Sequence, residues 1–330
     1  MNAQPDALQP PVAPKPPAPD PVSEPRNPQL AAWYKAARPR SLTATYIPLT
    51  LAAVIAIDKG VFDLLRFVLS MVAALLLQIG ANLVNEYFDY VRGADAEKQA
   101  GMGMVIKGAI LTPEAVRNGA IATIGLGVIL GLILVVMSGP VLLLIGLGGV
   151  LVAVLYTAGP LPLAYIGLGE IAVFIFMGPL MVLGAYYAMA RELSWAPVLA
   201  ALPIACLVAA ILHANNVRDL EADRAVNKRT LAVIFGRNFA RAEYFGLVGG
   251  AYIVLIVLIA VDQMPWLTLA ALVTLQEARR LIQLTNKSED PQVLHMVQGR
   301  TARLHRDFGL SLIIGWLATL LLGALLRSIS

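Results

Sequence analysis

Long runs of apolar residues, interrupted by short polar segments, fill the chain from residue 41 onward. Run 120–137 contains no charged residue, and about 20 residues suffice for a helix to cross the hydrocarbon core of a bilayer. Lipid offers no hydrogen bonds to an open backbone, so spanning runs must be helical. The pattern therefore predicts an all-α polytopic membrane protein with about nine transmembrane helices. The nine predicted spans are Leu42–Ile57, Phe62–Asn85, Gly119–Ser138, Val141–Tyr156, Ile166–Ala190, Pro197–Ala214, Phe245–Val261, Trp266–Leu284 and Phe308–Leu326.

The chain before the first span has a different composition. Its first 28 residues hold ten of the 21 prolines and few large aliphatic side chains, so they cannot bury enough surface to fold. They also lack the apolar core of a signal peptide, so the first span must direct insertion. We expect a disordered, Pro-rich tail over residues 1–36 and one transmembrane domain over residues 37–330.

Composition and charge support the membrane interpretation. Hydrophobic residues make up 58% of the chain and charged residues 14%, against about 25% charged in a typical soluble protein. The 25 Lys and Arg residues lie in the tail and in the loops after spans two, six and eight, with four exceptions: Lys59, Arg66, Arg191 and Arg327. The positive-inside rule then predicts that the N-terminus and these loops are cytoplasmic. The missing targeting segment, together with the quinone chemistry considered below, leads us to expect a prokaryotic cell membrane. Basic residues that flank spans do not form a nucleic-acid patch, and the single Cys206 excludes a disulfide scaffold.

Two clusters of carboxylates and amides lie at cytoplasmic ends of predicted helices. Asn82, Asn85 and Asp89 are three and four residues apart at the end of the second span, so they share one helical face. A further carboxylate, Asp95, follows after Gly93.

The second cluster follows the sixth span and repeats this spacing. Asp219 and Asp223 are four residues apart, and Asn215 continues their face one turn earlier. Carboxylates at this spacing repel each other, and the penalty is larger at a membrane boundary. A hard cation between the clusters would remove it, and Mg²⁺ is typically held by few protein oxygens together with substrate phosphates. The alternative is a solvated loop whose acids pair with nearby Arg and Lys, and two matching clusters weigh against it.

Basic residues follow each acidic cluster. Lys98 and Lys107 come after the first, and Lys228 and Arg229 after the second. Mg²⁺ with Lys and Arg is an arrangement that binds a diphosphate and stabilises it as a leaving group. The surrounding helices provide an apolar chamber open to lipid, so these features together predict a polyprenyl diphosphate as substrate.

At these residues the chain resembles the UbiA superfamily of intramembrane aromatic prenyltransferases, which carries Asp-rich motifs after its second and sixth helices. The resemblance is sharper toward the branch that prenylates 1,4-dihydroxy-2-naphthoate in menaquinone synthesis, and the six-residue separation of Asp89 and Asp95 is similar to that branch. Four stretches carry it: Ala37–Leu42, Asn82–Asp95, Tyr156–Glu170 and Asn215–Val233.

The resemblance implies a UbiA-type bundle and an Mg²⁺-dependent transfer that releases CO₂ and diphosphate and gives demethylmenaquinol. Asp89, Asp219 and Asp223 would be the catalytic carboxylates. The implied metal ligands are Asn85, Asp89, Asp219 and Asp223, with Asp95 as a further candidate that could instead act through water. The candidate diphosphate contacts are Asn82, Lys107, Arg218, Lys228 and Arg229. Arg38, Tyr156 and Asn215 are candidates for the acceptor or the prenyl chain, although Arg38 could be only a topology signal and Tyr156 only an interfacial anchor.

Other functions remain open at this point. A related enzyme could use homogentisate, 4-hydroxybenzoate, haem or chlorophyllide as acceptor. A transporter could bind a coupling ion at the same carboxylates, but its site would lie near the midplane. A phosphatidyltransferase of the alcohol type would carry an Asp–Gly–x–x–Ala–Arg pattern, which is absent from this sequence. Among single residues, Glu170 is expected to pair with Lys or Arg of the loops, with a direct catalytic role as the alternative, and His295 and His305 are expected to be solvated.

Overall fold

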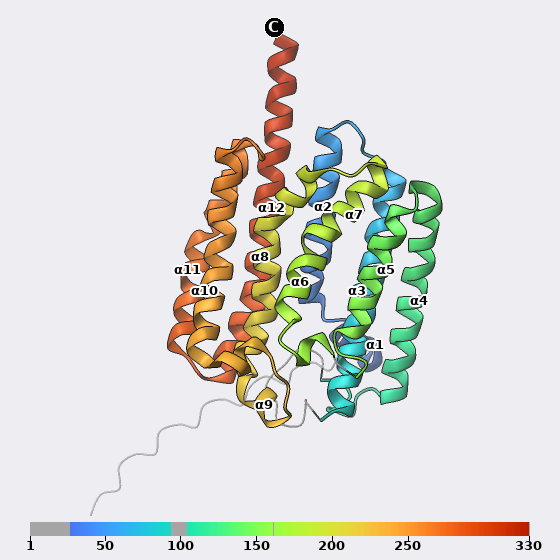
Figure 1. Ribbon diagram of the computed structural model, residues 1–330, viewed down its shortest axis with the longest axis vertical. Coiled ribbons are helices and arrows are strands. Elements are labelled where there is room, and N and C mark those ends of the chain that lie inside the picture. The colour runs from blue at the N-terminus through green and yellow to red at the C-terminus, as the bar shows by residue number, and fades with distance from the viewer. Residues whose placement is uncertain (1–26, 94–103, 161, 330) are drawn as a thin grey trace, which may run out of the picture.

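The computed structural model describes residues 27–93, 104–160 and 162–329, and all regular structure within these ranges is helical (Figure 1). The helices run side by side along the long axis of the molecule, which confirms the predicted all-α membrane bundle. The elements are α1 (Pro28–Ala36), η1 (Pro39–Leu42), α2 (Thr43–Asp58), α3 (Leu64–Val91), α4 (Pro113–Ser138), α5 (Val141–Leu155), η2 (Leu163–Tyr165), α6 (Gly169–Met177), α7 (Pro179–Ala190), α8 (Trp195–Arg218), α9 (Leu220–Ala225), α10 (Leu231–Ala260), η3 (Trp266–Thr274), α11 (Leu275–Lys287) and α12 (Pro291–Ile329).

Seven helical segments of the described chain are long and apolar enough to cross a membrane, so the predicted count of nine is not confirmed. Two of the seven join neighbouring elements, namely η1 with α2 and α6 with α7. The fourth predicted span is the apolar but short α5, of 15 residues. The eighth, Trp266–Leu284, divides into the 3₁₀ helix η3 and the amphipathic α11, on which Ala278 and Leu281 are buried and Arg279 is exposed.

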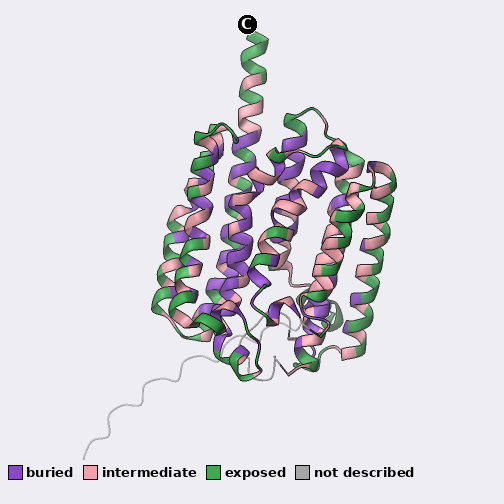
Figure 2. Ribbon diagram, viewed as in Figure 1, coloured by how far each residue is buried: buried purple, intermediate pink, exposed green. Residues whose placement is uncertain are grey.

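The buried interior lies mainly between α2, α7, α8, α10 and α12 (Figure 2). Ile47, Leu207, Leu255 and Phe308 are fully or almost fully buried there. Small residues allow the helices to approach closely, as is common in membrane bundles. A Cβ atom built on Gly309 of α12 would lie 2.3 Å from the Cγ2 atom of Ile47 on α2. The α2–α12 contact therefore has no room for a larger residue.

The opposite side of the bundle is more loosely packed. Helices α3 and α4 contact each other along much of their length, and a Cβ on Gly80 would lie 2.4 Å from Ile124 Cγ1. Helix α5, however, contains no buried residue. Gly149, Val152 and Ala153 of this helix line a cavity between the helices.

The transmembrane domain begins earlier than predicted. Pro28–Ala36 forms α1, in which the Oδ1 atom of Asn27 accepts a hydrogen bond from the Leu30 amide at 3.1 Å. Ala36 is fully buried, and Trp33 stands against Gly119 of α4. Pro28–Ala36, expected to belong to the disordered tail, is therefore a helix that packs on the bundle, while the division of the chain at residues 36 and 37 stays a prediction. Residues 1–26 of the predicted tail lie outside the described ranges.

Both acidic clusters lie at one end of the bundle. Helix α3 ends at Val91 and helix α8 at Arg218, and both ends lie at the bottom of Figure 1, the same end of the bundle as α9. We call this the loop end. Helix α12 ends at the other side, where its last turns extend beyond the neighbouring helices.

Candidate active site

A small polar cavity of about 60 Å³ lies at the loop end between α3 and α8. Asn85 and Asp89 enter it from the last turns of α3, and Asn215 and Asp219 from the end of α8. Lys228 enters from the loop that follows α9. We call this cavity the polar mouth. Residues separated by more than a hundred positions thus meet in one site, as the two matching clusters predict.

A larger apolar chamber of about 230 Å³ adjoins the polar mouth. Arg38, Asn85, Tyr156, Leu212 and Asn215 belong to the walls of both cavities. The rest of the chamber wall is chiefly apolar and includes Ala74, Leu77, Val152, Phe176, Val208 and Ile211. The arrangement can therefore hold a molecule with a charged head and a hydrocarbon chain.

Asp219 is held by its neighbour Arg218 in a bidentate ion pair. The Nε and Nη2 atoms of Arg218 donate to the two carboxylate oxygens at 2.7 and 2.6 Å, a geometry that makes a strong charge-assisted contact. The Nη1 atom of Arg218 lies 3.0 Å from Nδ1 of His295 on α12. The expectation that His295 is solvated is therefore wrong, because α12 continues through this segment and places it against Arg218.

Asp223 and Lys228 form a second, more buried ion pair. The carboxylate of Asp223 is fully buried and accepts from Lys228 Nζ at 3.3 Å. The backbone amide of Lys228 donates to the Asp223 carbonyl at 2.8 Å, and Nζ stands 5.6 Å from the ring centre of Tyr165. Lys228 thus reaches the polar mouth, whereas Asp223 lies behind it and is not among the described wall residues.

Several predicted diphosphate contacts do not line the polar mouth. Lys107 and Arg229 are exposed and lie outside the described cavity wall. The Asn82 amide donates to the Ala37 carbonyl at 2.8 Å and to Ser41 Oγ at 3.0 Å, so Asn82 fastens the start of η1 and borders only the apolar chamber. Asp95 lies outside the described residues.

Glu86 is a buried anchor for the loop after α3, a role that helical spacing did not indicate. It is fully buried, and its carboxylate accepts hydrogen bonds from the backbone amides of Met104 at 2.9 Å and Val105 at 2.6 Å. Arg38 Nη2 donates to the same carboxylate at 3.2 Å. Glu86 therefore connects the returning loop to a residue that lines both cavities.

Arg92 is a second structural residue that the sequence patterns did not single out. Its guanidinium donates to the carbonyls of Thr157 and Gly159, the latter at 2.6 Å. It also lies 5.2 Å from the ring centres of Phe88 and Tyr165. Arg92 thus connects the end of α3 with the turn after Tyr156, next to the polar mouth.

A buried network of side chains supports the end of α8. Glu170 Oε1 accepts from Asn216 Nδ2 at 2.7 Å and lies 3.0 Å from His213 Nδ1. His213 Nε2 lies 2.7 Å from the Ala240 carbonyl, which can only accept, so Nε2 carries the hydrogen of that bond. A second proton must then lie between Nδ1 and the carboxylates of Glu170 and Glu243. The expectation that Glu170 pairs with a loop Lys or Arg is wrong, because the imidazole of His213 on α8 takes that place.

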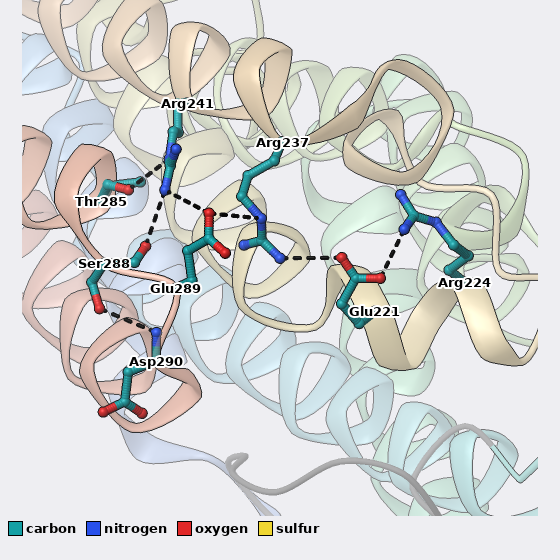
Figure 3. A network of polar contacts seen from close by, with 8 residues as sticks. All are labelled: Glu221, Arg224, Arg237, Arg241, Thr285, Ser288, Glu289 and Asp290. Carbon is teal, nitrogen blue, oxygen red and sulfur yellow. Dashed lines mark hydrogen bonds and ion pairs between the residues drawn. The ribbon is translucent and has the colours of Figure 1, made fainter.

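An exposed network holds α9 against the neighbouring helices (Figure 3). Glu221 pairs with Arg224 at 2.8 Å and with Arg237 at 3.3 Å. Glu289 pairs with Arg241 at 3.3 Å and with Arg237 at 3.6 Å. Individual exposed pairs contribute little to stability, but Glu221 links α9, the helix that carries Asp223, to Arg237 of α10.

The oxygen atoms around the polar mouth fit a hard cation. Asn85 Oδ1 is buried and has no hydrogen-bond partner among the described residues. The carboxylates of Asp89 and Asp219 border the same cavity, and oxygen donors of this kind suit Mg²⁺. The described residues also include a deeper acidic group, Glu170 with His213 and Glu243, whose ligand-type atoms lie within 4.8 Å of one another. The hydrogen bonds of His213 described above already occupy both of its ring nitrogens.

Comparison with known proteins identifies the family of the chain. The model of the UbiA prenyltransferase family matches residues 46–298. A 1,4-dihydroxy-2-naphthoate octaprenyltransferase of Bacillus subtilis is 33% identical over 86% of this chain and 91% of its own length. One from Mycobacterium tuberculosis is 32% identical over 72% of this chain and 80% of its own. A UbiA prenyltransferase domain-containing protein 1 homologue of Drosophila melanogaster is 32% identical over 87% and 79%.

Solved structures share the fold. A UbiA homologue from Archaeoglobus fulgidus bound to GPP and Mg²⁺ superposes with a TM-score of 0.58 at 18% identity, over 86% of this chain and 99% of the other. An apo homologue from Aeropyrum pernix gives a TM-score of 0.61 at 16% identity, over 82% and 97%. The family match and the relatives above 30% identity, which are prenyltransferases, contradict the transporter and phosphatidyltransferase alternatives. A match across most of the chain, relatives above 30% identity and the shared fold together make this multi-pass membrane protein a prenyltransferase of the UbiA family.

Proposed function

We propose that the protein transfers a polyprenyl group from polyprenyl diphosphate to 1,4-dihydroxy-2-naphthoate and releases diphosphate and CO₂, giving demethylmenaquinol for menaquinone synthesis. One observation carries the proposal: carboxylates and amides from α3 and α8 border a polar mouth that opens directly into an apolar chamber. The diphosphate would lie in the mouth and the prenyl chain in the chamber. The names of the bacterial relatives support this donor and acceptor.

Mg²⁺ would be held by Asn85, Asp89 and Asp219. Asp223, which lies on α9 and pairs with Lys228, would contribute from behind the polar mouth. When bound, the ion supplies positive charge against the diphosphate oxygens. Lys228 adds a fixed cation at the same opening, because its Nζ atom is held by Asp223 and by the face of Tyr165. Arg218 provides a further positive charge beside Asp219.

In the proposed reaction the bond between the first prenyl carbon and the diphosphate oxygen breaks, and its electrons leave with the diphosphate. The apolar chamber wall keeps water away from the resulting allylic cation. The electron-rich ring carbon that carries the carboxylate attacks this cation. Loss of CO₂ from the same carbon returns an electron pair to the ring, so no protein base has to remove a proton there.

Arg38 is well placed to receive the acceptor carboxylate. It borders both cavities, and one of its terminal nitrogens is held by Glu86 at 3.2 Å. Its Nε atom is buried and has no hydrogen-bond partner among the described residues. A naphthoate at the junction of the mouth and the chamber would supply that acceptor. Tyr156 and Asn215, which also border both cavities, would contact the ring or the first isoprene unit.

The basic loops at the loop end support an orientation in which the polar mouth and the N-terminus face the cytoplasm of a prokaryotic cell membrane. Soluble naphthoate would then reach the mouth from the cytoplasm, and the prenyl donor would arrive from the bilayer.

The test is a turnover assay on the purified full-length protein with labelled octaprenyl diphosphate, 1,4-dihydroxy-2-naphthoate and Mg²⁺, with and without EDTA. The expected result is a prenylated, decarboxylated naphthoquinol that disappears with EDTA. Product formed only with 4-hydroxybenzoate or homogentisate would show that the proposed acceptor is wrong. Activity that survives EDTA would show that the reaction does not require Mg²⁺.

A further inference from the structure

An arginine-rich surface lies where α11 packs against the first half of α12. The Nε and Nη2 atoms of Arg300 donate to the two carboxylate oxygens of Glu277, both at 2.7 Å. Arg280 follows Glu277 by about one turn of α11, Arg303 follows Arg300 by about one turn of α12, and both are exposed. We call Arg280, Arg300 and Arg303 the arginine cluster. None of the three is among the described wall residues of the polar mouth or the chamber, so the proposed reaction does not use them.

The arginine cluster carries more positive charge than its protein neighbours neutralise. The hydrogen bonds from its arginine partner lower the pKa of Glu277, and the nearby charges of Arg280 and Arg303 act in the same direction. The side chains of Arg280 and Arg303 form no hydrogen bond or ion pair within the described part of the chain. Asp307, one turn along α12 from Arg303, is already paired with Arg306 at 2.8 Å. Three arginines against one glutamate therefore leave a net charge of +2 at this surface.

The basic residues around α9 are arranged differently. Arg224, Arg237 and Arg241 each pair with Glu221 or Glu289, so most of their charge is neutralised within the protein (Figure 3). The arginine cluster instead leaves two guanidinium groups without a carboxylate of their own. A guanidinium group in this state can donate several hydrogen bonds to an anion from outside the protein. The cluster is therefore the better candidate for an anion site.

The arginine cluster lies where the two helices leave the hydrocarbon of the membrane. Arg303 and Leu310 are seven positions apart on α12, so they share a helical face and are separated by about 10 Å along the axis. Leu310 and Ile314 are exposed on that face, Ile314 by 62%. Val273, which is 77% exposed, precedes Arg280 by seven positions on the way to the loop end. Each exposed arginine thus follows a lipid-facing aliphatic side chain by about two turns, and its long side chain can reach the phosphate level of the bilayer.

We propose that the arginine cluster binds the headgroup of an anionic phospholipid of the phosphatidylglycerol type. The lipid phosphate accepts hydrogen bonds from Arg280 and Arg303, because guanidinium groups match the geometry of phosphate oxygens. The acyl chains lie along Leu310 and Ile314, directly above the arginines. A zwitterionic lipid fits less well, because its ammonium group meets a surface of net positive charge. An acidic protein segment would match the charge but not the aliphatic face above it.

The experiment measures lipid binding to the purified full-length protein in a non-ionic detergent by native mass spectrometry. The probes are phosphatidylglycerol and phosphatidylcholine with the same acyl chains. We expect the Kd for the first phosphatidylglycerol to rise about fivefold in Arg303→Gln and about 25-fold when Arg280→Gln is added, while phosphatidylcholine changes by less than about twofold. Arg306→Gln is the matched control, because it removes the same charge from an arginine of α12 that Asp307 already pairs, and it should leave both Kd values nearly unchanged.

Removing the negative charge tests the same reasoning in the opposite direction. Glu277→Gln takes away the carboxylate that occupies Arg300, so phosphatidylglycerol should bind about fivefold more tightly, whereas simple damage to the surface would weaken binding. Weaker or unchanged binding in this variant would contradict the proposal.

Two further outcomes would overturn the lipid site. Equal Kd values for the two lipids in the wild-type protein would favour an acidic protein partner for this surface. An equal loss of phosphatidylglycerol binding in Arg303→Gln and Arg306→Gln would show that the lipid responds only to the total charge of the protein. Neither measurement involves turnover, so a wrong prenyl acceptor would leave this test intact.

Discussion

Replacing Glu86 by Gln should release the loop after α3 without unfolding the bundle. The carboxylate is fully buried, and its three shortest hydrogen bonds come from the backbone amides of Met104 and Val105 and from Arg38. Hydrogen bonds to a charged group are worth about 1 kcal/mol more each than bonds to a neutral one, so three such bonds give a loss of about 3 kcal/mol. The Gln side chain would also place its NH₂ group, which can only donate, against the backbone amide donors of the loop.

The loss should be local, because only the loop contacts disappear and the helical core is untouched. At about 1.4 kcal/mol per factor of ten, the opening equilibrium at the Val105 amide should rise about 100-fold. Hydrogen exchange measured by mass spectrometry in nanodiscs would report this on the peptide that contains Val105. The control is Glu114→Gln, an exposed carboxylate in the first turn of α4. Unchanged exchange at Val105 in Glu86→Gln would refute the reasoning.

Three further changes test other parts of the molecule. Asp219→Ala should abolish turnover while the protein stays folded in detergent, whereas Asp307→Ala, an exposed carboxylate on α12, should not; near-normal activity of Asp219→Ala would contradict the two-cluster site. Gly309→Val should lower the free energy of unfolding by about 2 kcal/mol in thermal melts, because its side chain collides with α2, while Gly323→Val, with open space around it, should change little. Glu170→Leu should lower kcat about tenfold, because the side-chain amide of Asn216, which borders the polar mouth, loses the carboxylate that holds it. An unaltered kcat would show that this network serves packing only.

Sequence spacing was sufficient to place the two clusters at one end of the bundle. Positions three and four apart must share a helical face, and the basic loops assigned both faces to the same side of the membrane. Asp89 and Asp219 therefore meet in the structure at the polar mouth. The role of each as a metal ligand stays a prediction.

Partners across helices could not be read from one sequence. The spacing of a single helix does not reveal that Arg218 lies against His295 of α12, or that Glu86 accepts from a loop eighteen residues later. The same limit explains His305, which the prediction placed in a solvated loop. It is fully buried in α12, because that helix begins seventeen residues before the apolar run that predicted the span and carries polar residues into the interior.

The uneven packing of the bundle makes the surrounding lipid part of the fold on one side. The half built on α8 and α12 is held together by its own side chains, whereas α5 has no buried residue and relies on whatever hydrocarbon lies against it. Stripping lipid with a harsh detergent should therefore loosen α5 first, and with it the wall that carries Tyr156. Such a preparation would keep most of its helical content and still lose the shape of its active site. We therefore expect the lipid composition of the assay to change the shape of the active site, as a mutation in the core of the protein would.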